Sequence, residues 1–359
     1  MNQNCKVSAA GFSIIGDGRY SYNQDTYDIR LNFIPEIPGS FYAGVFDGHG
    51  GLNFTEQKSG GAISNFVKKT LPPILEHELR SILFPTKNPS GTVEDLSKHE
   101  QKNQSKDDSK DQQSYHEDNG ELFINSRYVE RAIQNAFQQT TQETKNFLKE
   151  AGLLNRGAGG TTAVVALLLQ DELYIASVGD SIAFMCFYTE SQISTIPLNR
   201  KHNWCWADES ARIQQKGGNF HQQQSGSYLI DENGQNCLNM SRSMADFEYE
   251  SQGLIHTPDI TRHTVTKWRD FALLLASDGV SDIVSTKDCA NILGDLYGHY
   301  VEAGDDEIIK QELALKVSLN WPDESGFRVI RNRIPIISQR SVFFSNIFSS
   351  YNWSPLHQR

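Results

Sequence analysis

The chain lacks the features that define three broad classes of protein. No apolar run approaches the ~20 residues of a membrane-spanning helix, so we expect no membrane association. Its five cysteines are scattered and form no C-x-x-C pair, which disfavours a zinc ribbon or a disulfide scaffold and indicates reduced thiols. Basic residues are outnumbered, and the net charge of −11 argues against a nucleic-acid partner, whose binding requires a basic surface.

The first residues also lack a targeting signal. The segment from Met1 to Lys6 has no apolar core of a signal peptide, and Lys6 is the only basic residue before Asp17, which makes a poor transit peptide. We therefore expect a cytoplasmic protein, with the nucleus as the alternative.

One long segment has no aliphatic residue. Residues 97–121 consist almost entirely of charged and amide side chains with serine, and Tyr115 is their only aromatic residue. Such a composition cannot bury enough apolar area to offset the entropy of an ordered chain. We interpret residues 97–121 as a disordered insertion; a docking or phosphorylation segment is the alternative interpretation.

Apolar patterning elsewhere predicts an α+β fold, because strands are grouped in blocks with helices between the blocks. A central meander of antiparallel hairpins is expected from three successive strands, and Pro72-Pro73 is expected to break a helix or to open its second half. The expected strands are residues 10–15, 27–33, 41–46, 161–170, 172–178, 182–188 and 271–276. The expected helices are residues 63–69, 73–83, 128–151, 207–216, 286–296 and 305–319.

The most informative run is Val-Phe-Asp-Gly-His-Gly-Gly at residues 45–51. Asp47 offers a hard oxygen ligand, and Gly48 lets the backbone approach closely enough for its carbonyl to ligate an ion. His49 has an ordinary pKa near neutrality, so it can act as an acid or a base. On its own, however, Asp-Gly is also a common turn pair.

Four further blocks contain aspartates, most of them near the end of an apolar run. They are Asn23-Gln24-Asp25, Ser177-Val178-Gly179-Asp180-Ser181, Met240-Ser241-Arg242-Ser243-Met244-Ala245-Asp246 and Ala276-Ser277-Asp278-Gly279-Val280-Ser281-Asp282. Together with residues 45–51, in this order, they resemble the metal-dependent protein serine/threonine phosphatases of the type 2C family. Gly159-Gly160-Thr161-Thr162-Ala163, and Arg212-Ile213 with Gly217-Gly218, add to the resemblance, which covers roughly residues 10–290.

The resemblance implies two mostly antiparallel central sheets sandwiched by helices, and a site for two Mg²⁺ or Mn²⁺ ions. It implies that Asp47 bridges the two ions, that the Gly48 carbonyl ligates one, and that Asp25 and Asp278 complete much of the coordination. Asp180, Asp246 and Asp282 would support the centre or hold a weaker third ion. His49 resembles the family's general acid toward the leaving oxygen.

The residues themselves are compatible with this chemistry. Magnesium and manganese prefer carboxylates, carbonyls and water, and aspartates at strand ends without a His/Cys cluster match that preference. Two such ions lower the pKa of bound water and clamp a phosphoryl group. Taken singly, each aspartate is more often a helix cap or turn residue, so the joint pattern carries the hypothesis.

Three departures from the family stand out. The family's phosphate-binding arginine is replaced by Tyr20, and Arg19, one position further away, is the candidate for that role; tyrosine cannot bind phosphate bidentately. Ala245 replaces a glycine, a small change unless the position requires a positive φ. From Trp321 onward nothing matches the family's final Asp-Asn strand, although Asp323 lies at about the right distance.

These observations divide the chain into an expected phosphatase-like catalytic domain at residues 8–320, with the insertion at 97–121, and an atypical basic tail at residues 321–359. The leading hypothesis is a monomeric, metal-dependent protein serine/threonine phosphatase that acts on phosphorylated proteins. The alternatives are a catalytically weak or inactive phosphatase-like scaffold and a metal-dependent hydrolase of small phosphate esters.

Overall fold

The computed structural model describes most of the chain, with gaps. The described residues are 6–14, 22–51, 59–84, 115–118, 121–190, 192–218, 220–223, 226–231, 237–267, 269–302 and 340–348. Within them, no helix is both long enough and apolar enough to cross a membrane. Arg19, Tyr20, Asp323 and the helix expected at residues 305–319 lie outside the described residues.

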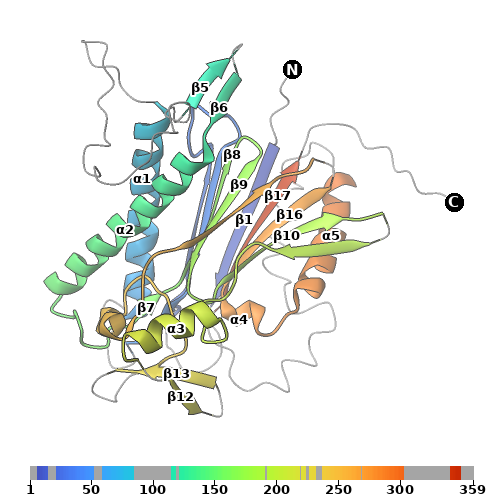
Figure 1. Cartoon of the computed structure of the whole chain (residues 1–359). Helices are drawn as coiled ribbons and strands as arrows, with labels where there is room; N and C mark the ends of the chain where they lie inside the picture. The colour runs from blue at the N-terminus through green and yellow to red at the C-terminus, as the bar shows by residue number, and fades with distance from the viewer. Residues whose placement is uncertain are drawn as a thin grey trace, which may run out of the picture.

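Two five-stranded antiparallel sheets lie face to face at the centre of the molecule (Figure 1). The first sheet has the order β15-β9-β8-β3-β2, and the second has the order β1-β17-β16-β10-β11. The strands of the first sheet are β2 (Thr26–Leu31), β3 (Phe41–Phe46), β8 (Ala163–Leu169), β9 (Glu172–Val178) and β15 (Asp259–Thr264). Those of the second are β1 (Lys6–Ile14), β10 (Ile182–Tyr188), β11 (Ile193–Pro197), β16 (Asp270–Ala276) and β17 (Arg340–Phe348).

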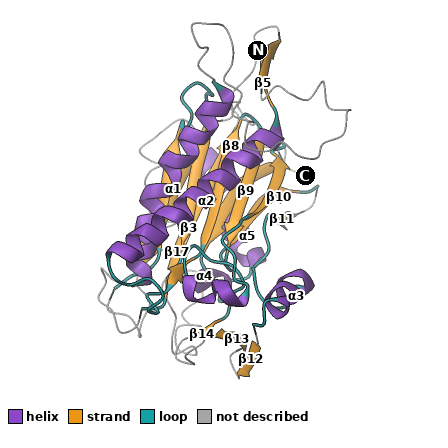
Figure 2. Ribbon diagram, turned by 60° about the vertical axis from the view of Figure 1, so that its left-hand side comes forward, coloured by secondary structure: helices purple, strands orange, loops and turns teal. Residues whose placement is uncertain are grey.

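Helices cover both outer faces of this sandwich (Figure 2). The long helices α1 (Gly60–Leu83) and α2 (Ser126–Glu150) lie on the first sheet, and α5 (Thr286–Glu302) packs on the second. The short helices are α3 (Ala207–Gln215), α4 (Asp278–Ser281) and the 3-10 helix η2 (Phe247–Gln252). The α+β sandwich expected from the sequence is therefore confirmed.

The position of strand β8 explains why its sequence is a continuous apolar run. All seven of its residues are buried, and its side chains alternate between two cores. Val165 and Leu167 pack against α1 and α2, whereas Val164 and Ala166 pack between the two sheets. A strand covered on both faces needs apolar residues at every position.

Helix α1 is continuous, although Pro72 and Pro73 lie inside it. The expected break is therefore wrong. A proline inside a helix removes one backbone hydrogen bond and clashes with the preceding turn. Here Val67, Leu71 and Leu75 are fully buried at four-residue spacing on the face that meets the first sheet. This packing outweighs the local preference of the two prolines.

The expected meander is also only partly correct. Strands β8 and β9 form an antiparallel pair, but β10 pairs with β16 and β11 in the other sheet. The turn Gly179-Asp180-Ser181 therefore carries the chain from one sheet to the other. Gly179 has a φ of 94°, a conformation that favours glycine. The crossing places Asp180 at the open end of the sandwich, between the two sheets.

Part of the expected insertion is ordered. Strand β5 (Tyr115–Asp118) pairs with β6 (Glu121–Ile124) in a separate two-stranded sheet, so the expected disorder is wrong for these residues. Residues 97–114 and 119–120 lie outside the described residues.

The tail also contributes to the sandwich. Strand β17 lies between β1 and β16 and pairs antiparallel with both. The expected boundary at residue 320 therefore does not separate a tail from the domain, because residues 340–348 complete the second sheet. The apolar residues Val342, Phe343 and Phe344 give this segment the composition of a strand.

Small strands complete the site end of the molecule. Strand β4 (Gly48–His49), which follows β3 in the sequence, pairs with β7 (Gly160–Thr161), which precedes β8. Strands β12 (Phe220–Gln223), β13 (Gly226–Ile230) and β14 (Cys237–Leu238) form a three-stranded sheet beside α3. Ile213 of α3 and Leu229 of β13 share a small core there.

Candidate active site

The strand register places four of the expected aspartates together at one end of the sandwich. In the first sheet Thr26 pairs with Phe46, so Asp25 and Asp47 occupy the next opposed positions. In the second sheet Ile182 pairs with Ala276, so extending the register by two residues brings Asp180 opposite Asp278. Each sheet thus supplies one pair of aspartates to the same edge.

The charges of these aspartates act on one another. The pKa of Asp47 is raised well above its ordinary value by loss of solvation and by the nearby carboxylates of Asp25, Asp278 and Asp180. Burial and Asp278 raise the pKa of Asp180 to about 6, and Lys201 and His49 oppose that rise. The cluster therefore has an excess of negative charge that a proton or a cation would relieve.

Thr162 joins the two halves of the cluster. Its backbone N–H donates to the Asp47 carbonyl at 2.9 Å, and its side-chain oxygen accepts from the Asp47 N–H at 3.1 Å. The same oxygen lies 2.7 Å from the Ser181 hydroxyl, next to Asp180. Thr162, the second threonine of the Gly-Gly-Thr-Thr block, thus fixes the end of β3 relative to the turn at Asp180 that connects the two sheets.

His49 is held by Asp246. The two side chains approach to 2.7 Å between His49 Nε2 and Asp246 Oδ2, and the Ser243 hydroxyl donates to the same carboxylate oxygen at 2.6 Å. Burial lowers the pKa of His49, but the Asp246 carboxylate outweighs it and the net pKa is raised. The pKa of Asp246 is lowered, because His49 and Ser243 outweigh the effect of burial.

Glycines make room for this arrangement. A Cβ on Gly160 would collide with the Asp246 carboxylate, and a Cβ on Gly48 would lie 2.5 Å from the Gly60 carbonyl and 2.6 Å from that of Gln24. Real side chains do not tolerate such approaches. Both glycines of the sequence blocks are therefore required by close packing around His49.

The loop before Asp246 is strained. Ala245 has a φ of 143° and Asp246 has a φ of 51°. The first conformation is adopted almost only by glycine, which explains why the family has glycine where this chain has Ala245. The surrounding structure must therefore hold this loop in place.

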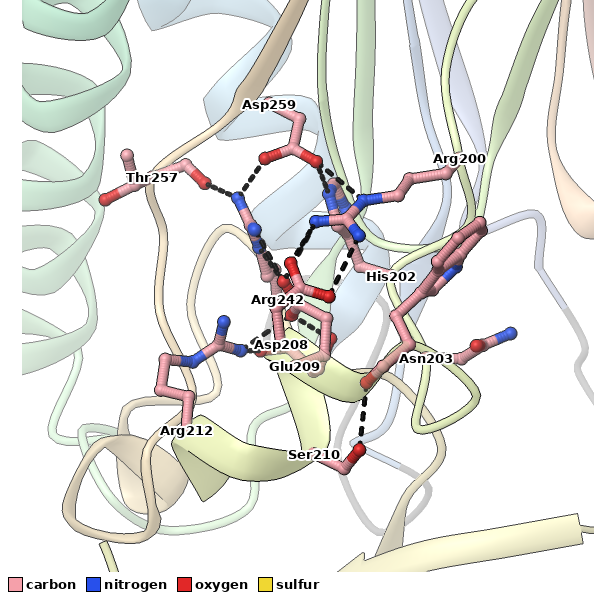
Figure 3. Close-up of polar contacts among 12 residues, drawn as sticks. Arg200, His202, Asn203, Asp208, Glu209, Ser210, Arg212, Arg242, Thr257 and Asp259 are labelled. Carbon is pink, nitrogen blue, oxygen red and sulfur yellow. Dashed lines mark hydrogen bonds and ion pairs between the residues drawn. The ribbon is translucent and has the colours of Figure 1, made fainter. Parts of the chain in front are cut away.

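A buried polar network provides that support (Figure 3). The Glu209 carboxylate, fully buried on α3, accepts from Arg242 at 2.5 Å, from Arg212 at 2.7 Å and from the Ser241 hydroxyl. Arg242 and Ser241 open the loop that carries Ser243 and Asp246. The network therefore connects helix α3 to the loop that carries Asp246, the residue that contacts His49.

Asp259 extends the network toward a second loop (Figure 3). Its carboxylate lies 2.7 Å from Arg242 Nη1, 2.9 Å from Arg200 Nε and 3.2 Å from His202 Nε2. Arg200 also forms a two-point contact with Asp208, at 3.0 and 2.6 Å. Residues 200–202 are thereby fixed to the same structure as the Asp246 loop.

Sequence reasoning missed this network. The sequence offered only indirect signals: Arg242 lies inside one of the aspartate blocks, and Glu209 precedes Arg212 by three residues, one helical turn. Nothing in the sequence indicated that Asp259, at the start of β15, contacts Arg242 and Arg200.

The expected site residues therefore fall into three groups. The structure brings together Asp25, Asp47, Asp180 and Asp278, with Gly48 and His49 beside them. Asp246 contacts His49, and Asp282, at the end of α4, forms an ion pair with Lys201 at 2.6 Å. Arg19 lies outside the described residues, so its proposed role stays a prediction.

The donor groups fit a divalent cation in their chemistry. Burial and the carboxylates of Asp25, Asp278 and Asp180 all raise the pKa of Asp47, and such oxygen ligands suit Mg²⁺ or Mn²⁺. In the part of the chain that is described, however, no three acidic, histidine or cysteine side chains already form a group that could hold a metal ion.

Comparison with known families agrees with this picture. Residues 89–313 match the family model of protein phosphatase 2C, which is more than half of the chain. The chain belongs to the protein phosphatase 2C family. The matched range includes Asp180, Asp246 and Asp278; the segment with Asp25, Asp47 and His49 precedes it.

Individual relatives extend the match. The chain is 27% identical over 304 residues to the human integrin-linked kinase-associated serine/threonine phosphatase 2C, covering 80% of this chain and 62% of that protein. It is 29% identical over 294 residues to the probable protein phosphatase 2C 59 of Arabidopsis thaliana, covering 82% and 71%. A serine-threonine phosphatase 2C from Toxoplasma gondii has the same fold, with a TM-score of 0.66 at 16% identity over 97% of this chain and 98% of that one. The chain thus spans less than two thirds of the human relative's length.

Proposed function

We propose that this chain is a metal-dependent protein serine/threonine phosphatase. The observation that carries the proposal is the meeting of Asp25, Asp47, Asp180 and Asp278 at one end of the sandwich, beside the His49–Asp246 pair. Membership of the phosphatase family supports it. A cluster of carboxylates suits cations, and a neighbouring histidine with a raised pKa suits proton donation.

Asp47, Asp25 and Asp278, with the Gly48 carbonyl, would hold Mg²⁺ or Mn²⁺. Two such ions supply activation of water and neutralise charge on the phosphoryl oxygens. Asp180 lies close enough to Asp47 and Asp278 to add its charge to the same centre.

His49 would donate a proton to the leaving serine or threonine oxygen. Its Nε2 contacts Asp246 at 2.7 Å, and its Nδ1 is buried in this structure. Asp246 stabilises the protonated imidazole and fixes its orientation, and Ser243 fixes Asp246. The raised pKa of His49 keeps the proton available near neutral pH.

Turnover of a phosphoserine or phosphothreonine peptide in Mn²⁺ tests the proposal. We expect hydrolysis that EDTA abolishes and that Asp47→Asn removes. A folded chain that binds Mn²⁺ but hydrolyses neither a phosphopeptide nor p-nitrophenyl phosphate would instead support the phosphatase-like scaffold. Hydrolysis of small phosphate esters with no turnover of phosphopeptides would support the third hypothesis.

The remaining expectations belong to the same proposal. Phosphorylated proteins would be the substrates, and the chain would act as a monomer. The expected cytoplasmic or nuclear location also stays a proposal.

A further inference from the structure

Lys201 introduces a positive charge at the rim of the carboxylate cluster. Its Nζ lies 2.6 Å from Asp282 Oδ1, and Asp282 follows Asp278 by one turn of α4. We propose that Lys201 is an internal counter-charge that engages Asp282 and takes the place of a cation that Asp282 would otherwise help to hold. This inference rests on the proposed function of the same site.

The backbone around Lys201 is fixed on both sides. The N–H of His202 donates to the Gly179 carbonyl at 2.8 Å, which attaches this segment to the turn that carries Asp180. The Lys201 carbonyl accepts from the Trp206 indole at 3.1 Å. Lys201 therefore lies between the Asp180 turn and the end of α4, the two segments whose carboxylates face each other across the second sheet.

The neighbours of Lys201 strengthen this placement (Figure 3). Arg200 and His202, which flank it, both contact Asp259, and Arg200 also binds Asp208. An ordinary surface ion pair is worth little, because two flexible side chains lose entropy to form it. Here the contacts of Arg200 and His202 already order the backbone on both sides of Lys201. The ammonium group therefore forms its ion pair with Asp282 at a smaller entropic cost.

The charge of Lys201 also reaches Asp180. The segment that carries Lys201 lies beside this residue, because the N–H of His202 donates to the carbonyl of Gly179, which directly precedes Asp180. One ammonium thus acts on both Asp282 and Asp180. A divalent cation at this edge would have to displace the Lys201 ammonium or be repelled by it. The chain should therefore bind fewer ions here, or bind them more weakly, than the carboxylates would without Lys201.

Direct Mn²⁺ titration without substrate tests the inference, with binding followed by calorimetry and by the electron paramagnetic resonance of free Mn²⁺. We expect Lys201→Met to bind its most weakly held Mn²⁺ at least about tenfold more tightly than the unaltered chain, or to bind one additional ion. Lys145→Met is the matched control. Lys145 forms a comparable ion pair with Glu250, at 2.8 Å, and its side chain is 36% exposed against 30% for Lys201.

A double-variant cycle identifies the carboxylate involved. We expect Asp282→Asn alone to leave Mn²⁺ binding unchanged, because Lys201 already engages this carboxylate, and we expect it to reverse the gain in the Lys201→Met background. Loss of a bound ion in Asp282→Asn alone would overturn the inference. This measurement does not require the Lys201→Met variant to fold. Equal binding by Lys201→Met and the unaltered chain would also overturn the inference. An unaltered chain that binds no Mn²⁺ at all would instead contradict the proposed function.

Discussion

Glu209→Gln should destabilise the fold and disturb the site at once. The carboxylate is fully buried and accepts from Arg212, Arg242 and Ser241. Arg242 is only 7% exposed, so the amide would leave a buried guanidinium without its closest charged partner. Breaking a buried ion pair typically costs about 3–5 kcal/mol. Arg242 keeps Asp259 at 2.7 Å, so we expect the lower end, about 3 kcal/mol.

The acid dependence gives an independent magnitude. Burial raises the pKa of Glu209, but Arg212, Arg242 and Ser241 outweigh it and hold the pKa at about 2, against an ordinary 4.5. This difference corresponds to about 3 kcal/mol, which we reduce to about 2 kcal/mol because Arg212 is partly exposed and solvent screens it. Since the pKa is lowered on folding, this stability is complete above pH 4.5 and is lost as the pH falls toward about 2.

Urea unfolding at pH 7 and at pH 3 measures both effects. At pH 7 we expect Glu209→Gln to lower the unfolding free energy by about 2–3 kcal/mol, or the melting temperature by about 5 °C. At pH 3 the gap between the variant and the unaltered chain should shrink. Glu143→Gln, on the exposed face of α2, is the control and should change little. Equal stability of the Glu209 variant and the unaltered chain at pH 7 would refute the role of the network.

Three further predictions concern the site and the insertion. Asp47→Asn should lower turnover by at least about 100-fold, because it removes charge that holds the cations; near-normal turnover at saturating Mn²⁺ would contradict the metal assignment. His49→Gln should leave Mn²⁺ affinity unchanged and slow alkyl phosphates more than aryl phosphates, whose leaving groups need less protonation; equal slowing in a kinetic comparison would count against its role as an acid. Deleting residues 97–114 should leave the melting temperature nearly unchanged, because these residues have no aliphatic side chains to contribute to a core; a large drop in a thermal melt would show the opposite.

Strand ends were predictable because their signal is local. The run at residues 41–46 is apolar at every position and ends at Asp47, and the structure has a strand with the same bounds. Strands at residues 172–178 and 182–188 likewise have their expected bounds. A continuous apolar run followed by a turn pair leaves few alternative conformations.

Pairing between distant segments was not predictable in the same way. Whether β10 continues the sheet of β9 or crosses to the other sheet depends on β16, which lies about 90 residues later in the sequence. Strand β17 was missed for the same reason, since the basic composition of the tail hid a short apolar segment that fits between β1 and β16. Such pairings are decided by tertiary packing and not by local pattern.

The site was predictable in its aspartates and not in its supports. Asp47, Asp180 and Asp278 lie at or near the ends of apolar runs, where the sequence pattern reveals them, and Asp25 was recognised by its Asn-Gln-Asp block. Glu209, by contrast, is a single acidic residue on a polar helix, and most such residues are solvated. Only the fold shows that Arg242 contacts both Glu209 and Asp259 and that Lys201 lies beside Asp282.

Metal-dependent dephosphorylation by the carboxylate cluster can be tested directly. The decisive measurement is the release of phosphate from a phosphothreonine peptide by the purified chain across a Mn²⁺ titration, with Asp47→Asn measured in parallel. We expect turnover that rises with Mn²⁺, disappears with EDTA and is nearly absent in the variant. Phosphate release that persists in EDTA, or that is equal in the variant, would contradict the proposed function.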